Sequence, residues 1–432
     1  MEEWRFGNME KCRSRNMEEG REKVNEQQSS KRLRLNTSPR RELRLNANEQ
    51  RSNKLQISLN NYFLTHELNN HKVAAVIKLI NEFPEEVVRE ILLRVTYKSH
   101  YKLMSVCKSW NAMVDNHTFY QDRIRFGRYE ELICLIQRLD GGWAHHKLGQ
   151  SEAGPFSTQY CKPSQVVTIY DPVHDKWEAA PSFPTGYRFE HTDSCCVSIN
   201  HKLVFFGLYK QDTDKPTHVV LVYDFSSSIW KQGSDMPVFH SAFACAVSPH
   251  DGLIYIAGGY HRDGRKNTMF YNVEKDKWEI LPKMQQNITR CQGFFNHDKF
   301  YVISHYNSDI EIFDTNKRLW TTLKNMWISG WHPDHCVAGF GGLYYFQNGV
   351  KEYDWKENVW RKIGHFPSMF EYVSFGGTAW QDKIFLIGID SKDQERFSMF
   401  QLLKSGTMIF ERWIQRPIDI YDHVLAAVNV KV

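Results

Sequence analysis

The histidines and cysteines are the side chains best suited to metal binding or catalysis, but their spacing supports neither. His145-His146 precedes Cys161, and no second pair of ligands follows at the spacing of a zinc site. The sequence also lacks the Gly-x-Ser-x-Gly motif of hydrolases and the Gly-x4-Gly-Lys-Ser/Thr motif that binds phosphates. We therefore expect surface histidines, no metal, no cofactor and no enzymatic activity.

Cysteine usage and the N-terminal residues indicate the compartment. Nine cysteines are scattered without a Cys-x-x-Cys pair, and only Cys195 and Cys196 are adjacent. The chain starts with charged residues and has no apolar signal segment, so these thiols should be reduced. No apolar run approaches the roughly 20 residues of a membrane span. We expect a protein of the cytoplasm and/or nucleus that does not enter a membrane.

Residues 1–75 differ in composition from the rest of the chain. They hold 15 Lys/Arg and 10 Asp/Glu, a difference of +5 that equals the net charge of the whole chain. Few aliphatic residues occur before Val73, so we expect a disordered basic tail. Its basic cluster, Lys31–Arg34 with Arg40-Arg41, is a candidate nuclear import signal, and the alternative is a solvated disordered segment. Ser38, which precedes Pro39, is a candidate phosphorylation site. The remaining residues are neutral overall, which argues against nucleic-acid binding.

The elements that would position a binding site repeat along the second part of the chain. Tryptophans recur at intervals of 40 to 53 residues. They are Trp177, Trp230, Trp278, Trp320, Trp360 and Trp413. An aromatic residue followed by Asp or Asn stands seven residues before each of the first five. Two strand-like segments joined by a tight polar turn precede each unit. Four strands in a repeat of this length are typical of a propeller blade.

This repeat resembles the kelch motif over residues 131–432. Gly258-Gly259 ends a second strand, and Tyr271 and Trp278 follow as in a kelch unit. The resemblance implies a mainly β fold, a six-bladed kelch β-propeller, in which Gly258, Gly259 and the first five repeated tryptophans are structural. The first unit lacks its innermost strand, and the run at residues 423–432 could supply it beside residues 131–138. Such pairing would remove the free sheet edges.

A short helical module precedes the propeller. Apolar residues recur at helical spacing from Val87 to Val114, and Pro84 with Glu85 and Glu86 is a good helix start. The pattern breaks near Thr96, which indicates two or three short helices. Residues 80–119 resemble the F-box, most specifically in Val-Cys-Lys-Ser-Trp at 106–110. By this resemblance the module binds Skp1, and through it a cullin and a RING protein, with Phe83, Pro84, Val87, Ile91, Leu103, Val106, Cys107 and Trp110. The alternative is that these residues form the core of a small cap on the propeller.

We therefore expect a disordered tail at 1–75, an α-helical F-box at 76–125 and a propeller at 126–432. The order resembles plant F-box/kelch-repeat proteins, also in Glu-Glu-Leu-Ile-Cys-Leu at 130–135. This resemblance implies a substrate receptor of an SCF-type ubiquitin ligase whose substrate is an enzyme of phenylpropanoid metabolism or a transcriptional regulator. Two alternatives remain: a kelch scaffold outside any ligase, and a propeller enzyme similar to galactose oxidase. Co-purification with Skp1 and metal analysis distinguish them.

The substrate surface is expected where long loops meet. The loops after the second strand and the connections between repeats share one propeller face, whereas the turns of the opposite face are short. Aromatic residues and arginines are enriched at binding hot spots, and loops on a rigid scaffold carry function. The candidate residues on this face are Tyr187, Arg188, Phe239, His240, Arg290, Trp327, Trp331 and Phe370. The alternative for each is packing between blades.

Overall fold

The computed structural model describes residues 77–78, 80, 82–139, 164–190, 192–213, 215–260, 266–328, 330–367, 370–390, 394–415 and 424–432. The candidate tail, Ser38, the basic cluster, His145-His146 and Cys161 lie outside the described residues. The chain divides into two compact units, residues 1–95 and 96–432, which we describe separately. No helix in the described part is long and apolar enough to cross a bilayer.

The first unit contains helix α4 (Glu85–Leu93). Pro84 stands at its N-cap with φ −54°, and Glu85 and Glu86 place negative charge at the positive end of the helix dipole, as the sequence predicts. One side of the helix, with Val88, Ile91, Leu92 and Leu93, is buried. Arg94 and Glu90 form an ion pair of 2.8 Å one turn apart. The N-terminal turn of α4 therefore keeps an exposed surface.

The second unit begins with short helices. They are the 3-10 helix η1 (Tyr97–Ser99), α5 (His100–Met104), α6 (Lys108–Val114) and α7 (His117–Arg125). Extended backbone at Cys107 separates α5 from α6, and Asn116 caps α7 by accepting the Thr118 N–H at 2.9 Å. This segment therefore has more short helices than the two or three that we expected, because extended and capping residues interrupt the apolar pattern.

The described strands of the second unit pair mostly in antiparallel groups of four, which we number sheets 1–6 in chain order; sheets 5 and 6 are joined into one eight-stranded sheet. Sheet 1 contains β26 (Val424–Lys431), β1 (Glu131–Leu139), β2 (Ser164–Asp171) and β3 (Lys176–Ala179). Sheet 2 contains β5 (Cys195–Ile199), β6 (Lys202–Phe206), β8 (Val220–Asp224) and β9 (Ile229–Gly233). Sheet 3 contains β10 (Ala244–Val247), β11 (Ile254–Ala257), β12 (Thr268–Asn272) and β13 (Lys277–Leu281).

Sheets 4 to 6 repeat this order. Sheet 4 contains β14 (Cys291–Asn296), β15 (Lys299–Ser304), β16 (Ile310–Asp314) and β17 (Leu319–Leu323). Sheet 5 contains β18 (Cys336–Gly339), β19 (Gly342–Phe346), β20 (Val350–Asp354) and β21 (Val359–Gly364). Sheet 6 contains β22 (Phe370–Trp380), β23 (Lys383–Asp390), β24 (Glu395–Leu402) and β25 (Met408–Ile414), and one residue pair, Gly364 with Met408, joins it to sheet 5. The short strands β4 (Tyr187–Arg188) and β7 (Tyr209–Lys210) pair separately, and the 3-10 helix η2 (Pro333–His335) precedes β18.

Five of the six repeated tryptophans occupy the same place in their sheets, opposite the repeated aromatic residue; Trp413 instead lies opposite Ser398. Trp278 lies directly opposite Tyr271 on the neighbouring strand, with their rings stacked 4.7 Å apart, and Trp177 stacks on Tyr170 at 4.5 Å. The indole N–H of Trp278 donates to the carbonyl of Ser234 in the preceding sheet at 2.9 Å. The other four tryptophans bond in the same way to the carbonyls of Pro181, Pro282, Met326 and Gln415. These five bonds link each of sheets 2 to 5 to the sheet before it, and sheet 1 back to sheet 6.

The Asp or Asn after each repeated aromatic residue forms the following turn. In sheet 5, Asp354 accepts the N–H groups of Lys356 and Glu357 at 2.9 and 3.1 Å. In sheet 1, Asp171 accepts those of Val173 and His174 in the same way. The residue two positions before each of the first five repeated tryptophans has a left-handed backbone, as in Asp276 with φ 49°. Short polar side chains that bond to nearby N–H groups favour such turns. The aromatic-Asp/Asn pair therefore sets both the packing and the turn.

The apolar core lies between neighbouring sheets. Side chains alternate along β1, so that Leu132 and Cys134 pack toward sheet 2 while Ile133 and Leu135 pack toward sheet 6. Similar clusters lie between sheets 2 and 3, 3 and 4, 4 and 5, and 5 and 6. Both faces of these strands are buried, which explains their nearly continuous apolar sequences. The clusters join the sheets in a circular order, a propeller-like arrangement.

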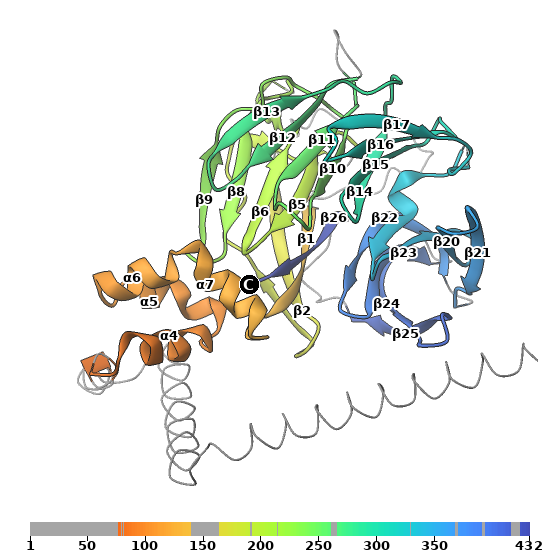
Figure 1. Ribbon diagram of the computed structural model, residues 1–432. Helices are drawn as coiled ribbons and strands as arrows, with labels where there is room; N and C mark the ends of the chain where they lie inside the picture. The colour runs from red at the N-terminus through yellow and green to blue at the C-terminus, as the bar shows by residue number, and fades with distance from the viewer. Residues whose placement is uncertain are drawn as a thin grey trace, which may run out of the picture. The chain divides into compact units, whose positions relative to one another are not determined.

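Strand β26 completes sheet 1 from the far end of the chain. It pairs with β1 in antiparallel register, from Glu131 opposite Lys431 to Gln137 opposite Val424, and Figure 1 shows it in dark blue beside β1. The pairing expected for residues 423–432 is thus confirmed. Asn429 strengthens this closure, because its side-chain amide donates to Glu131 at 2.8 Å and to the Ala379 carbonyl at 2.7 Å.

Candidate functional site

The first turn of α4 supplies the exposed part of the proposed docking surface. Pro84 is exposed, Phe83 is half-buried and Val87 is 37% exposed. Ile91, two turns into the helix, is fully buried. Phe83, Pro84 and Val87 can therefore contact another protein, whereas Ile91 stabilises the fold of the unit.

The helical segment of the second unit also contains both buried and accessible residues of the predicted docking surface. Leu103 and Trp110 are buried, while Val106 and Cys107 are half-buried at the break before α6. Tyr101, which the sequence pattern did not single out because it lies off the apolar side, is 46% exposed. Tyr101 on α5, and Val106 and Cys107 between α5 and α6, are thus accessible apolar residues of this stretch.

The helical segment of the second unit is fixed to sheets 1 and 2. The Tyr120 ring of α7 stacks on His201, in the turn between β5 and β6, with centroids 3.6 Å apart. Arg123, which is almost fully buried, pairs with Glu130 at 2.7 Å. Burial lowers the pKa of Arg123 and raises that of Glu130, and the attraction between the two charges opposes both shifts. Removing one partner would leave a buried charge, so this contact holds the segment in place.

A second contact lies beside the first. The ring of Tyr97 meets Phe225 edge to face at 5.7 Å, and its backbone N–H donates to Glu130 at 3.2 Å. His201 lies 3.5 Å from Asp224. Burial alone would raise the pKa of Asp224, but the charge of His201 and the hydrogen bonds from Ser226 lower it. We call the set Tyr97, Tyr120, Arg123, Glu130 and His201 the module seam.

Two residues predicted for the substrate face do not reach the surface. His240 is 0% exposed, and its Nδ1 lies 2.5 Å from the Gly258 carbonyl. Trp327 is 1% exposed and packs between sheets 4 and 5 against Tyr345. Both side chains support the fold, so neither belongs to a surface that contacts a partner.

The other predicted residues lie at separate points of the unit. Arg188 pairs with Glu190 and lies over the Tyr209 ring, next to Tyr187 in β4. Phe239 is half-buried beside His218. Trp331 stacks on Tyr345 with ring centroids 3.8 Å apart, so it contributes partly to packing. Phe370 is the first residue of β22. The structure does not bring these residues into one cavity.

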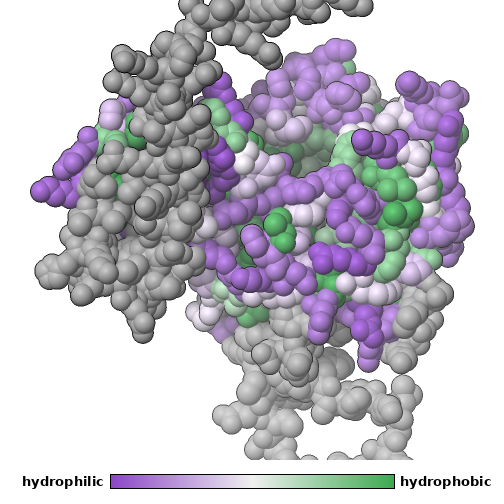
Figure 2. All heavy atoms as spheres, turned by 90° about the horizontal axis from the view of Figure 1, so that it is seen from below, coloured by the Kyte–Doolittle hydropathy of each residue, from purple (hydrophilic) through white to green (hydrophobic). Residues whose placement is uncertain are grey.

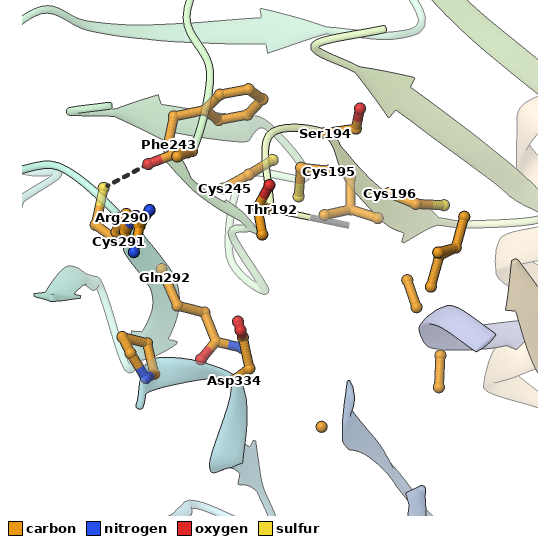
Figure 3. A pocket seen from close by; sticks show the side chains of 18 of the residues that line it. Thr192, Ser194, Cys195, Cys196, Phe243, Cys245, Arg290, Cys291, Gln292 and Asp334 are labelled. Carbon is orange, nitrogen blue, oxygen red and sulfur yellow. Dashed lines mark hydrogen bonds between the residues drawn. The ribbon is translucent and has the colours of Figure 1, made fainter. Parts of the chain in front are cut away.

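Arg290 lies at a cavity of about 290 Å³ at the start of the inner strands. Figure 3 shows it with Gln292 and Asp334, and with Thr192, Ser194 and Cys195 around the same space. His305 and His332 also line this cavity. The sequence analysis missed His305 as a site residue, although Ser304-His305 stands where Gly258-Gly259 stands in sheet 3, a substitution that places a side chain at this position.

A second cavity of about 440 Å³ lies further along the same strands. Both cavities are lined by Cys196, Cys245, Gln292, Gly377 and Val428, so they are successive parts of one central channel. Burial raises the pKa of the Cys245 thiol well above its usual range and that of Cys291 to about 12. Neutral thiols are poor nucleophiles and poor metal ligands. No group of three or more His, Cys, Asp or Glu side chains in the described residues could hold a metal ion.

The surface of the molecule is mostly polar on the face seen in Figure 2, with smaller apolar areas between the hydrophilic side chains. Exposed aromatic and aliphatic residues nevertheless occur near Arg290. Tyr306, which is 53% exposed, lies under the Arg290 guanidinium at 5.9 Å, and Tyr260 and Ile328 are also exposed. Aromatic residues next to an arginine are typical of a protein-binding hot spot.

The comparisons with known proteins agree with the two parts of the fold. The F-box domain family matches residues 80–122, and the Kelch motif family matches residues 242–285. These matches define a protein that joins an F-box to kelch repeats.

The chain belongs to the F-box/kelch-repeat proteins. It is 31% identical over 293 residues to the F-box/kelch-repeat protein SKIP20 of Arabidopsis thaliana, covering 58% of this chain and 67% of that protein. F-box/kelch-repeat protein At2g44130 of the same organism is 30% identical over 277 residues, covering 58% of this chain and 66% of the relative. The chain thus spans about two thirds of the length of these relatives. A solved structure of YjhT overlaps 57% of this chain and 91% of its own, with 13% identity and a TM-score of 0.44.

Proposed function

We propose that this chain is the substrate receptor of an SCF-type ubiquitin ligase and is not itself an enzyme. Its F-box would bind a Skp1-like adaptor, which connects to a cullin and a RING protein, and its kelch repeats would bind a protein substrate. The F-box match at residues 80–122 carries the proposal, together with the kelch match in the same chain. The proposed Skp1 contacts are the exposed Pro84 and Val87 and the half-buried Phe83, Val106 and Cys107.

The kelch repeats are proposed to form a closed six-bladed propeller, one blade for each of sheets 1–6. The inner strands support this arrangement, because they contact each other in the order β26, β5, β10 and β14, then η2, and then β18, β22 and again β26. The apolar clusters follow the same circular order. A closed ring leaves no free edge to aggregate.

The module seam supports the ligase function. Stacking of Tyr120 on His201 and the buried Arg123–Glu130 pair hold α7 against sheets 1 and 2. A rigid connection would keep a bound substrate at a defined distance from the ubiquitin-conjugating enzyme, which raises the effective concentration of its lysines.

The proposed substrate surface is the loop-rich face around Arg290, Tyr306 and Ile328, with Tyr187, Arg188, Phe239, Trp331 and Phe370 at its other parts. The resemblance to plant F-box/kelch proteins suggests an enzyme of phenylpropanoid metabolism or a transcriptional regulator as substrate. We propose action in the cytoplasm and/or nucleus.

Adaptor binding tests the ligase function directly. Val87→Glu places a charge on the exposed turn of α4 and should abolish co-purification with Skp1 and cullin. The matched control is Ile280→Glu, an exposed apolar residue of β13 that is 66% exposed and should leave co-purification intact. Wild-type protein that does not bind any Skp1-like adaptor would contradict the proposal and favour a kelch scaffold outside a ligase.

A further inference from the structure

Arg290 presents a positive charge to the central cavity. Its guanidinium lies over the Tyr306 ring, and no acidic side chain among the described residues forms an ion pair with it. Inside a cavity such a charge is screened by less water than at an open surface, so it attracts an opposite charge more strongly. The cavity therefore favours a negatively charged group.

The other charged groups of the cavity balance one another. His332 and Asp334 are 3.0 Å apart, and the hydrogen bond to Asp334 raises the pKa of His332. When His332 is protonated, this pair has no net charge. Arg290 then remains as the one uncompensated permanent charge among the described lining residues, with the His305 ring 5.0 Å from His332 as an additional polar group.

The backbone of Arg290 provides an independent indication that its side chain matters. Its φ is 47°, in the left-handed region that glycine and asparagine adopt with less strain than arginine. Non-glycine residues in strained conformations cluster at binding sites. Arginine is thus an unfavourable residue for this backbone position but a good one for binding an anion.

We propose that the mouth of this cavity binds one anionic side chain of the substrate, either the carboxylate of an acidic residue or a phosphate, through the Arg290 guanidinium. This inference rests on the proposed function, because it names the chemistry by which the substrate face recognises its protein. Arginine forms paired, charge-assisted hydrogen bonds with both carboxylate and phosphate. The exposed Tyr260, Tyr306 and Ile328 would contact the residues on either side of the anionic group.

Selection from peptide libraries tests the proposal. The full-length protein is immobilised and offered short random peptides whose central residue is fixed as Glu, phosphoserine, Ser or Lys. We expect retention of the Glu library, the phosphoserine library or both above the Ser and Lys libraries. The more strongly retained of the two anionic libraries identifies the source of the anion.

Three variants separate the charge of Arg290 from its effect on the fold. Arg290→Asn suits the left-handed backbone and should unfold at the same or a higher temperature than wild type, yet lose about tenfold or more of the retention of anionic peptides. Arg290→Lys should keep part of the preference. The matched control is Arg318→Asn, because Arg318 has φ 53° and pairs with Glu279 on β13, away from the cavity, so its retention should be unchanged.

Several outcomes would overturn the proposal. The first is equal retention of all four libraries by wild type. The second is undiminished retention of anionic peptides by folded Arg290→Asn. The third is retention of anionic peptides by wild type that persists in ~1 M salt, where exposed charges are screened. The last measurement uses wild-type protein alone and decides the case even if Arg290→Asn unfolds. Skp1 co-purification is scored on the same samples, so absence of the anion preference in wild type, with intact Skp1 binding, refutes this inference and leaves the proposed function standing.

Discussion

At the scale of single residues, the repeated tryptophans combine packing with one directed bond. Trp278→Phe keeps a ring opposite Tyr271 but removes the N–H that donates to the Ser234 carbonyl. We expect a loss of about 1 kcal/mol in the free energy of unfolding, measured by urea denaturation, since a net protein hydrogen bond contributes about this much. Trp360→Phe, which breaks the matching bond to Met326, should give a similar loss. Unequal losses would show that the bonds are not equivalent.

His332 makes anion binding dependent on pH. Its pKa is raised by the hydrogen bond to Asp334, while burial and the charge of Arg290 act in the opposite direction. His305 and His335 also face its ring. As pH rises through this raised pKa, His332 loses its proton and no longer offsets the negative charge of Asp334. We therefore expect retention of Glu peptides to be strongest at mildly acidic pH, above the ordinary glutamate pKa of about 4.3, and to fall as pH rises further.

The control for this pH dependence is His174→Asn, because His174 pairs with Asp171 in a turn of sheet 1 outside the cavity. Binding by this variant should follow the wild-type pH profile. In His332→Asn the fall should be absent or much smaller. An unchanged profile in His332→Asn would exclude His332 as the titrating group.

At the scale of elements, α7 depends on its N-cap. Asn116→Ala removes the acceptor for the Thr118 N–H and should lower the free energy of unfolding by about 1 kcal/mol. Asn116→Asp keeps an acceptor and adds a negative charge at the positive end of the helix, so its stability should match or exceed that of wild type. Thermal unfolding followed by circular dichroism measures both, and equal losses in the two variants would contradict the capping role.

The sequence predicts regular elements better than site residues, for a physical reason. Trp278, Tyr271 and Asn272 carry local information, because their spacing within one hairpin determines the pairing and the turn. Residues 423–432 could be assigned to sheet 1 because an inner strand was missing there. His240 and Trp327 were misplaced on the surface because an aromatic residue next to an inner strand can face either solvent or the neighbouring sheet. The cavity around Arg290 unites residues from several sheets, and their meeting depends on ring closure, which no local pattern reveals.

At the scale of the whole molecule, the module seam should affect ubiquitin transfer more than binding. His201→Ala removes the ring on which Tyr120 stacks but leaves the helices of the F-box unchanged. We expect normal co-purification with Skp1 and normal peptide binding, together with slower ubiquitylation of a bound substrate in a reconstituted ligase. A matched control is His297→Ala, an exposed turn residue of sheet 4, which should leave the rate unchanged. Equal rates for wild type and His201→Ala would show that the seam has no role in transfer.

Pairing of β26 with β1 has a consequence for synthesis on the ribosome. Residues 131–139 leave the ribosome long before residues 424–431, and until then Ile133 and Leu135 lack part of their cover and β1 lacks its inner neighbour. Strand pairs so distant in sequence form slowly, because a long loop must close first. We therefore expect the nascent chain to expose this edge until β26 is made, and a chain broken before Val424 to keep it as an open sheet edge.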